Sequence, residues 1–139
     1  MSAWRREAIA RLPELRKMIA AAPSVMYMWN ELWWPFRDAY ERQPRDEDFI
    51  RRVYAYADWC ERAPRTRDAG TDPPTAVAVA FYENLPTHPA VREDMPRWFT
   101  PEQIAISKGI FAYFMDEKQF AELMQEMQRN VGRYARNRL

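Results

Sequence analysis

The sequence has very little of the residues that hold small proteins together covalently or through a metal. Of its 139 residues, one is cysteine, Cys60, and one is histidine, His88. A single cysteine cannot form a disulfide within the chain, and the pair cannot supply the ligands of a Cys/His zinc site. No motif for a cofactor is present either. We therefore expect a protein without metal or cofactor, stabilised by its core.

An excess of charge of one sign and a long apolar run are also missing. The chain has 21 basic and 20 acidic side chains, for a net charge of +1, so no overall field attracts nucleic acid or a membrane surface. The longest uncharged run covers residues 18–30 and contains Pro23, which is too short for a membrane span. The charged N-terminus is not a secretory signal. We expect a cytoplasmic protein with no membrane partner.

Aliphatic residues are scarce, and aromatic residues and methionine replace them. Leu, Ile, Val and Phe together number 25, whereas the chain has 6 Trp, 7 Tyr and 8 Met. Buried Tyr and Trp need hydrogen-bond partners, so the core should have polar groups at its margins. The 18 Arg against 3 Lys favour a surface of arginine–carboxylate pairs. The length fits one globular domain over residues 1–139.

Proline divides the chain, with eleven residues against three glycines. Several prolines follow a capping residue and can begin a helix, where the missing N–H costs nothing. The pattern predicts an all-α fold of six to eight helices, with a short α-solenoid as the alternative, and Pro35 should kink or break its helix. The expected helices cover residues 2–11, 13–22, 24–41, 44–62, 73–85, 88–94, 100–115 and 116–136.

The clearest helix is the one over residues 44–62. Its apolar stripe consists of Phe49, Val53, Tyr56 and Cys60. Three acid-to-arginine pairs at i,i+4 support it, of which Asp48 with Arg52 is one. Because such surface pairs contribute about 0.3–0.5 kcal/mol, Arg52→Ala should cost little. A loop follows at 63–72. Near the C-terminus, Thr100 with Gln103 and Asp116 with Gln119 are spaced as capping boxes.

The segment AVAVAFY, residues 76–82, is apolar on every side. Asp72 followed by Pro73 is a helix start signal, so we expect a central, fully buried helix over 73–85 with the other helices packed around it. A β-strand is the alternative, because valine and alanine alternate. In the buried-helix interpretation, Val79→Asp should cost several kcal/mol.

The most unusual segment is MYMWNELWWPF, residues 26–36. Neighbouring residues of a helix point about 100° apart, so Trp33 and Trp34 cannot both face inward, and one of them is a candidate anchor for a protein partner. Tyr40, six residues after Trp34, is a third candidate. The competing interpretation places these aromatic residues in the core, with Glu31 paired to an arginine.

Carboxylates in apolar surroundings give the enzyme hypothesis. Glu31, Asp58 and Glu83 could act as acids or bases if two of them converged in one pocket. Metal binding by Glu83 with Glu93 and Asp94 lacks a supporting ligand spacing. We expect Cys60 to be a buried structural residue rather than a nucleophile, because it lies on the apolar stripe and His88 is distant in sequence. On balance we expect no enzyme.

The C-terminal segment RNVGRYARNRL contains four arginines and no acid. Arg129 and Arg133 fit the favourable position of cations at a helix C-terminus. Arg136 and Arg138 lie in a predicted flexible basic tail, residues 133–139, and are candidates for contacts with a partner. The alternative hypothesis is that these arginines bind the phosphates of a nucleic acid. Four positive charges and one tyrosine are weak support for it.

Three segments have distinctive amino-acid sequences: AYERQPRDEDFIRRVYAYADWC, AVAVAFYENLPTHPA and EDMPRWFTPEQ. Through them, the chain from about Pro35 to Leu123 resembles an uncharacterised family of small bacterial all-helical proteins. Members of that family look like the stand-alone proteins encoded beside polymorphic toxins, so the resemblance implies an immunity role by analogy. Together with the Trp, Tyr and Arg content, it favours a non-enzymatic protein-binding domain, most concretely an immunity-type protein that neutralises a cognate toxin.

Overall fold

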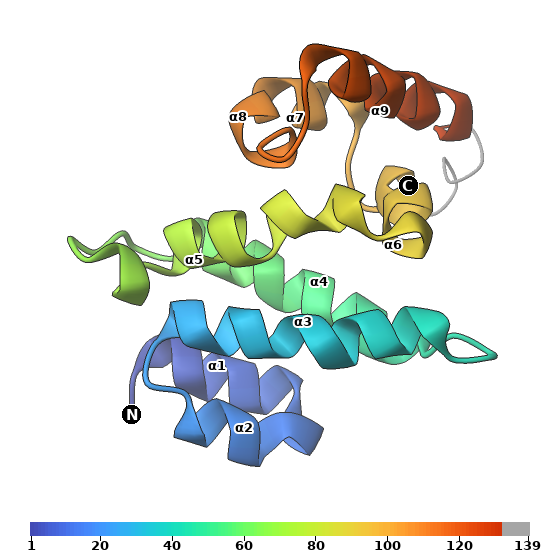
Figure 1. Cartoon of the computed structure of the whole chain (residues 1–139). Coiled ribbons are helices and arrows are strands. Elements are labelled where there is room, and N and C mark those ends of the chain that lie inside the picture. Colours follow the sequence, from blue (N-terminus) through green and yellow to red (C-terminus); the bar gives the residue numbers. More distant parts are fainter. Residues whose placement is uncertain (132–139) are drawn as a thin grey trace. The chain divides into compact units, whose positions relative to one another are not determined.

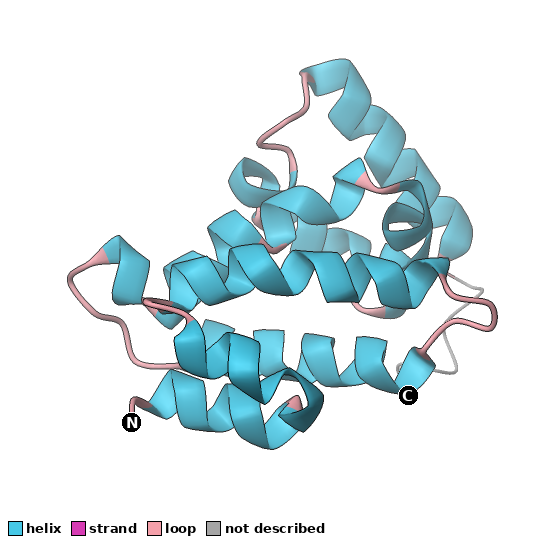
Figure 2. Ribbon diagram, turned by 60° about the horizontal axis from the view of Figure 1, so that its bottom comes forward, coloured by secondary structure: helices cyan, strands magenta, loops and turns pink. Residues whose placement is uncertain are grey.

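A computed structural model describes residues 1–131 of the chain. Within those residues every regular element is a helix, loops join the helices, and there is no strand (Figure 2). This confirms the all-α prediction and rejects the strand alternative for residues 76–82. The chain divides into two compact units, an N-terminal unit over Met1–Phe81 and a C-terminal unit over Tyr82–Leu139. The organisation as a single domain stays a prediction.

The described residues form nine α-helices and four short 3₁₀ helices (Figure 1). Those of the N-terminal unit are α1 (Ala3–Arg11), η1 (Pro13–Leu15), α2 (Arg16–Ala21), α3 (Val25–Glu41), α4 (Glu47–Arg62), η2 (Ala69–Thr71) and α5 (Pro73–Ala80). Those of the C-terminal unit are η3 (Tyr82–Thr87), α6 (Pro89–Asp94), η4 (Met95–Arg97), α7 (Pro101–Ile106), α8 (Lys108–Phe111) and α9 (Glu117–Asn130). The helices are more numerous than expected, because the segment predicted over 100–115 is divided at Ser107.

The long helices α3 and α4 organise the N-terminal unit. Each contacts the other and also α5, while α1 packs on α2 and α4 (Figure 1). The core between them is aromatic: the ring of Trp29 on α3 stacks on Phe81 at 4.7 Å and on Tyr56 of α4 at 5.4 Å between centroids. The Tyr56 hydroxyl donates a hydrogen bond of 2.9 Å to the carbonyl of Trp4. Such polar groups at the core margin are what the aromatic composition predicts.

The helix predicted over 73–85 is shorter and less enclosed than expected. The Asp72 carboxylate caps it by accepting from the Thr75 N–H, but α5 ends at Ala80 and a 3₁₀ helix follows. Pro86 lies inside this 3₁₀ helix, and a proline there sets only the latest end of an α-helix, at about Leu85. The prediction of burial on all sides is wrong: Val77 is fully buried, whereas Val79 is 44% exposed.

Pro35 does not break its helix. α3 continues from Val25 to Glu41 with Pro35 inside it. A proline removes one backbone hydrogen bond and strains the preceding turn. Leu32 and Phe36, on either side of it, are both fully buried. Their packing on the core compensates for that loss and keeps the helix continuous.

Both predicted capping boxes are present in the C-terminal unit. The Thr100 hydroxyl accepts from the Gln103 N–H at 3.1 Å, and the Asp116 carboxylate accepts from the Gln119 N–H at 2.8 Å. Tyr82, Phe99 and Phe111, the last residue of α8, form a second aromatic cluster, with centroid distances of 5.2 to 5.6 Å. The unit therefore has a core of its own.

Arg52 connects α4 to the chain near η1, so the expectation of a small effect for Arg52→Ala needs correction. Its guanidinium donates to both carboxylate oxygens of Glu14 at 2.7 Å, to Asp48 at 2.9 Å and to the Arg11 carbonyl at 2.9 Å. The hydrogen bonds to Glu14 raise the pKa of Arg52, and they lower that of Glu14. Bidentate pairs between charged groups are stronger than ordinary surface pairs.

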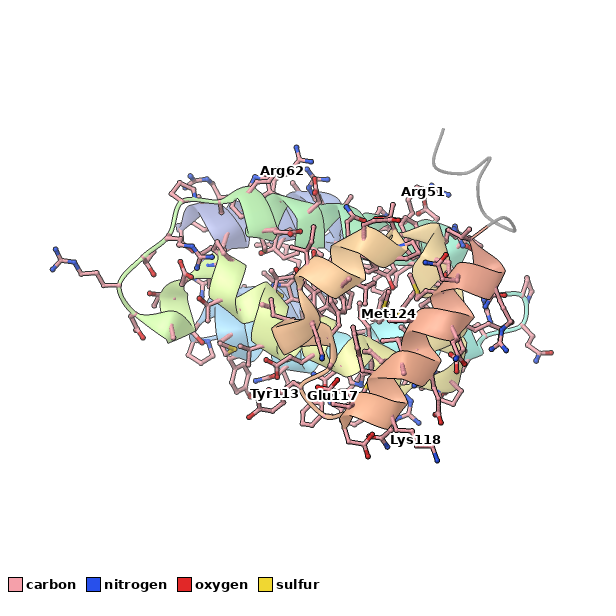
Figure 3. All side chains as sticks on the ribbon, turned by 90° about the horizontal axis from the view of Figure 1, so that it is seen from above. Arg51, Arg62, Tyr113, Glu117, Lys118 and Met124 are labelled. Atoms are coloured by element: carbon pink, nitrogen blue, oxygen red, sulfur yellow. The ribbon has the colours of Figure 1, made fainter. Side chains whose placement is uncertain are left out.

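We expect Arg52→Ala to destabilise the protein by about 1–2 kcal/mol, because it breaks this pair and leaves the Arg11 carbonyl without its donor. Arg51→Ala is the matched control. Arg51 also pairs with Asp48, at 3.3 Å, but it points away from α4 into solvent (Figure 3). Its loss should cost less than about 0.5 kcal/mol. Urea unfolding followed by circular dichroism makes the comparison, and equal midpoints would contradict the connecting role of Arg52.

Candidate functional site

The two adjacent tryptophans of α3 have different environments. Trp33 is half-buried, with its ring 5.8 Å from Phe36 and 6.4 Å from Phe81. Trp34 is 57% exposed. The opposite face of the helix is fixed in the core through Trp29, Leu32 and Phe36, which sets the rotation of α3 and directs Trp34 outward. Trp34 is therefore the accessible member of the pair.

Trp34 belongs to an exposed stripe, the outer face of α3, formed by Tyr27, Glu31, Trp34 and Asp38. These residues are four, three and four positions apart, so they follow one side of the helix. All four are exposed, Tyr27 by 49%. At 1.5 Å per residue the stripe is about 16 Å long. It carries two aromatic rings and two carboxylates, and no basic side chain.

Arg37 lies beside this face and contributes to its order. Its guanidinium carbon is 6.0 Å from the centre of the Trp34 ring, and its Nε donates to Glu41 at 3.1 Å. A guanidinium within about 6 Å of an indole is attracted to the face of the ring. The contact restricts the orientation of an indole that is otherwise in solvent.

Tyr40 does not share the exposure of Trp34. It is 3% exposed and packs edge-on against Phe36 at 5.3 Å, with the Arg45 guanidinium 5.2 Å from its ring. The burial and the ring contacts of Tyr40 are those of a core residue. A side chain buried this deeply offers almost no surface to a protein partner. The other two candidates for partner contacts, Arg136 and Arg138, lie outside the described residues.

The three carboxylates of the enzyme hypothesis are on different elements. Glu31 is on the outer face of α3. Asp58 is on α4, where it accepts from Arg62 at 3.3 Å, and it lines a shallow hollow with Trp59. Glu83 lies in η3 and lines a different hollow, which contains neither of the other two. Within residues 1–131 no group of three His, Cys, Asp or Glu side chains is arranged to hold a metal ion.

Cys60 is fully buried on α4, as the apolar stripe predicts. Burial raises the pKa of its thiol to about 12, from a usual value near 9, against the opposing effect of hydrogen bonding to Tyr56. The thiolate, which is the nucleophilic form, is therefore scarce at neutral pH. The environment of Cys60 favours an unreactive structural residue.

We expect native Cys60 to react with a thiol reagent such as DTNB at least about a hundredfold more slowly than in the urea-unfolded protein, because both access and ionisation are suppressed. The raised pKa also has a consequence for stability. The neutral thiol stabilises the folded state, and this stabilisation is complete below the usual thiol pKa near 9. It is lost as the pH rises toward about 12, because the thiol of the unfolded chain ionises first. Rapid labelling of the native protein at pH 8 would contradict this account.

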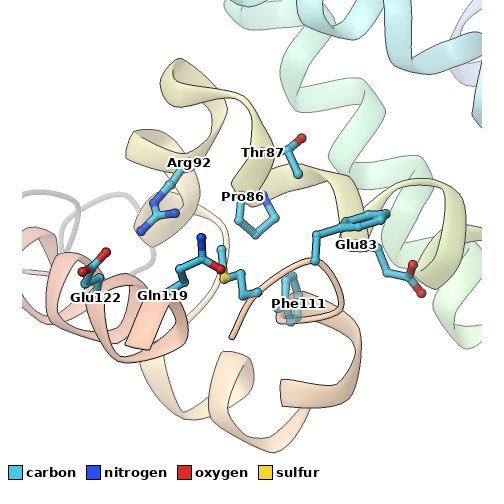
Figure 4. Close-up of a pocket in the computed structure, with 9 residues that line it drawn as sticks. Glu83, Pro86, Thr87, Arg92, Phe111, Gln119 and Glu122 are labelled. Carbon is cyan, nitrogen blue, oxygen red and sulfur yellow. The ribbon is translucent and has the colours of Figure 1, made fainter. Parts of the chain in front are cut away.

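Sequence reasoning did not find two features of the structure. Tyr27 and Asp38 complete the outer face of α3, and their spacing from Trp34 was a usable signal. The second feature is the hollow in the C-terminal unit that Glu83, Phe111 and Glu122 line together (Figure 4). It joins segments that are distant in the sequence, and no local pattern indicates it.

Within residues 1–131, no helix combines the length and the apolarity needed to cross a bilayer. Comparison of the chain with protein-family models, with curated proteins and with solved structures finds no match. The geometry of the chain itself is therefore the basis for assigning a function.

Proposed function

We propose that the chain is a non-enzymatic protein-binding domain that uses the outer face of α3, most concretely as an immunity-type protein that neutralises a cognate bacterial toxin in the cytoplasm. The observation that carries the proposal is the exposure of Trp34 on a helix whose opposite face is fixed in the core. Trp and Tyr are enriched among the few residues that dominate binding energies at protein interfaces.

The order of this surface supports the proposal. The outer face of α3 belongs to a seventeen-residue helix, capped at its start by the Ser24 hydroxyl, which accepts from the Tyr27 N–H. A preformed helical surface loses little conformational entropy on binding. Arg37 further restricts the Trp34 ring. An exposed aromatic side chain on such a rigid support suits a binding site.

The charges of the same face indicate the kind of partner. Glu31 and Asp38 place two carboxylates along the stripe, beside two aromatic rings. Complementary charges accelerate encounter and select partners. The partner should therefore be a protein with a basic patch bordered by apolar groups. The resemblance to a family of small bacterial helical proteins supports a toxin as that partner.

Capture of the partner on the tagged full-length chain from the cells that produce it, followed by titration of the two purified proteins, tests the proposal. We expect a stoichiometric complex in which Trp34→Ala weakens the affinity by about thirtyfold, the equivalent of about 2 kcal/mol. Glu31→Lys should also weaken binding, because it reverses a charge on the same face. Neither change should alter the unfolding midpoint by more than a small amount.

Tyr113→Ala is the matched control. Tyr113 is another exposed aromatic side chain, 65% exposed, and it projects from the C-terminal unit after α8 (Figure 3). Its replacement should leave the affinity unchanged. Recovery of no stoichiometric partner, or equal affinities for the Trp34→Ala variant and the unmodified chain, would refute the proposal.

A further inference from the structure

The segment of residues 63–72, which joins α4 to α5, is ordered without a core of its own. It leaves α4 after Arg62, includes η2 and reaches α5 at Asp72. None of residues 63–71 is buried, whereas Asp72 is 3% exposed. Burial of apolar surface is the main favourable term in folding, and it contributes little to this segment. Hydrogen bonds must therefore hold the segment in its conformation.

The Asp72 carboxylate joins this segment to the start of α5. Its Oδ1 accepts from the Thr66 N–H at 2.7 Å, and its Oδ2 accepts from the Thr75 N–H at 3.1 Å and from the Thr75 hydroxyl. The Arg65 guanidinium donates to Oδ2 at 3.2 Å. These hydrogen bonds, with that from the Thr75 hydroxyl foremost, lower the pKa of Asp72. One buried carboxylate therefore connects the loop to the first turn of α5.

The hydrogen bonds at the tip of the segment are local and exposed to water. The hydroxyls of Thr66 and Thr71 donate to the Asp68 carbonyl at 3.1 and 3.0 Å. The Asp68 carboxylate accepts from the Gly70 N–H at 3.1 Å. Water competes for such exposed groups, so each of these bonds adds little net stability. They shape the tip, whereas Asp72 ties it to α5.

The segment also contacts two helices of the N-terminal unit. η2 contacts α3 and α5, and it lies near the end of α3 at which that helix begins (Figure 1). The aromatic core is held separately, because the Trp29 ring stacks on Tyr56 and on Phe81. Loss of the contacts of η2 would uncover parts of α3 and α5 without removing these stacking contacts.

From this arrangement we infer that residues 63–72 form a strap, which opens and closes as a unit against α3 and α5 while the aromatic core stays folded. Asp72 is the clasp of the strap. Regions with few buried contacts open locally at a lower free energy than the core. Opening separates Arg65 from Asp72 and makes the peptide bonds after Arg65 and Arg67 accessible to a protease. The inference does not depend on the proposed protein interaction.

Amide hydrogen exchange of the full-length chain, followed by NMR, tests whether the strap opens by itself. The Thr66 amide donates to Asp72, and its protection should be at least about a hundredfold lower than that of the Val53 and Tyr56 amides in α4. Low urea concentrations should leave the exchange rate at Thr66 unchanged, because local opening exposes little surface. Equal protection at Thr66 and in α4 would mean that the strap opens only when the whole unit unfolds, and it would overturn the inference.

Asp72→Asn tests the clasp. Asparagine can still cap α5, but its side chain has one acceptor oxygen and no charge, so Thr66 and Arg65 lose their partner. Trypsin should cleave this variant after Arg65 and Arg67 at least about tenfold faster than the unmodified chain, because cleavage follows the population of the open form. The near-ultraviolet circular dichroism of the aromatic core should stay the same.

Asp58→Asn is the matched control, because Asp58 is an exposed, ion-paired carboxylate of α4 outside the strap. Trypsin should cleave its strap at the rate of the unmodified chain. An equal cleavage rate for Asp72→Asn and the unmodified chain would overturn the inference. Loss of the aromatic dichroism in Asp72→Asn would overturn it as well, because Asp72 would then hold the core and not the strap alone.

Discussion

Val77→Asp should remove about 4 kcal/mol or more of stability, whereas Val79→Asp, two residues away on the same helix, should cost about 1 kcal/mol. Val77 is fully buried on α5, which packs against α3 and α4. A carboxylate there would be desolvated without a prepared partner. Val79 faces solvent, so its replacement buries no charge. The remaining cost at Val79 comes from placing a negative charge near the helix C-terminus.

Urea unfolding of the two variants, followed by circular dichroism and by amide NMR, measures the difference. The sequence alone predicts similar, large effects for both, because each valine belongs to the same apolar segment. Similar unfolding midpoints for the two variants would therefore contradict the one-sided burial of α5. An unfolded Val77→Asp chain beside a folded Val79→Asp chain would agree with it.

Trp29→Ala should be the other severe substitution, with a loss of about 3–5 kcal/mol. The Trp29 side chain is fully buried between Phe81 and Tyr56, so truncation removes two stacking contacts and opens a large cavity. Partial collapse around the cavity would lower the cost toward 3 kcal/mol. The free energy of unfolding should therefore depend more on Trp29 than on Trp34.

Trp34→Ala is the matched control for Trp29→Ala, because it removes the same side chain from the same helix at an exposed position. It should cost less than about 1 kcal/mol. Urea midpoints again make the comparison. A loss of stability for Trp34→Ala as large as that for Trp29→Ala would mean that Trp34 is a structural residue, and it would also weaken the case for the outer face of α3.

Local signals predicted much of the fold. The apolar stripe of α4, the caps at Asp72, Thr100 and Asp116, and the prolines at helix starts each depend on residues within one or two turns. Such signals are visible in a single sequence. The end of α5 was not, because Pro86 alone permits an α-helix up to about Leu85, whereas α5 ends at Ala80.

The errors concern properties that depend on the tertiary structure. The apolar segment over 76–82 does not reveal which side of α5 its neighbours cover, so Val79 was expected to be buried. The effect of Arg52 depends on Glu14, 38 residues earlier in the chain. Pro35 was expected to kink or break its helix, and the break does not occur: α3 is continuous, with Leu32 and Phe36 buried on either side of the proline. Contacts distant in sequence decide each of these outcomes.

In the candidate site, too, local sequence predicts some features and tertiary contacts determine the others. Helical geometry predicted that one of Trp33 and Trp34 faces outward, but the core contacts of α3 determine that it is Trp34. The hollow of the C-terminal unit is lined by residues of η3, α6, α8 and α9 together, so it could not be assembled from the sequence. Tyr40 shows the limit of residue type as a signal, because this aromatic residue, six positions after Trp34, belongs to the core.

The central claim is that the outer face of α3 neutralises a protein toxin, and growth of cells that express the captured partner tests it most directly. Co-expression of the unmodified chain should restore growth, the Tyr113→Ala variant should restore it equally, and the Trp34→Ala variant should fail at the same protein level. Restoration of growth by the Trp34→Ala variant to the level of the unmodified chain, or no restoration by the unmodified chain, would contradict the claim.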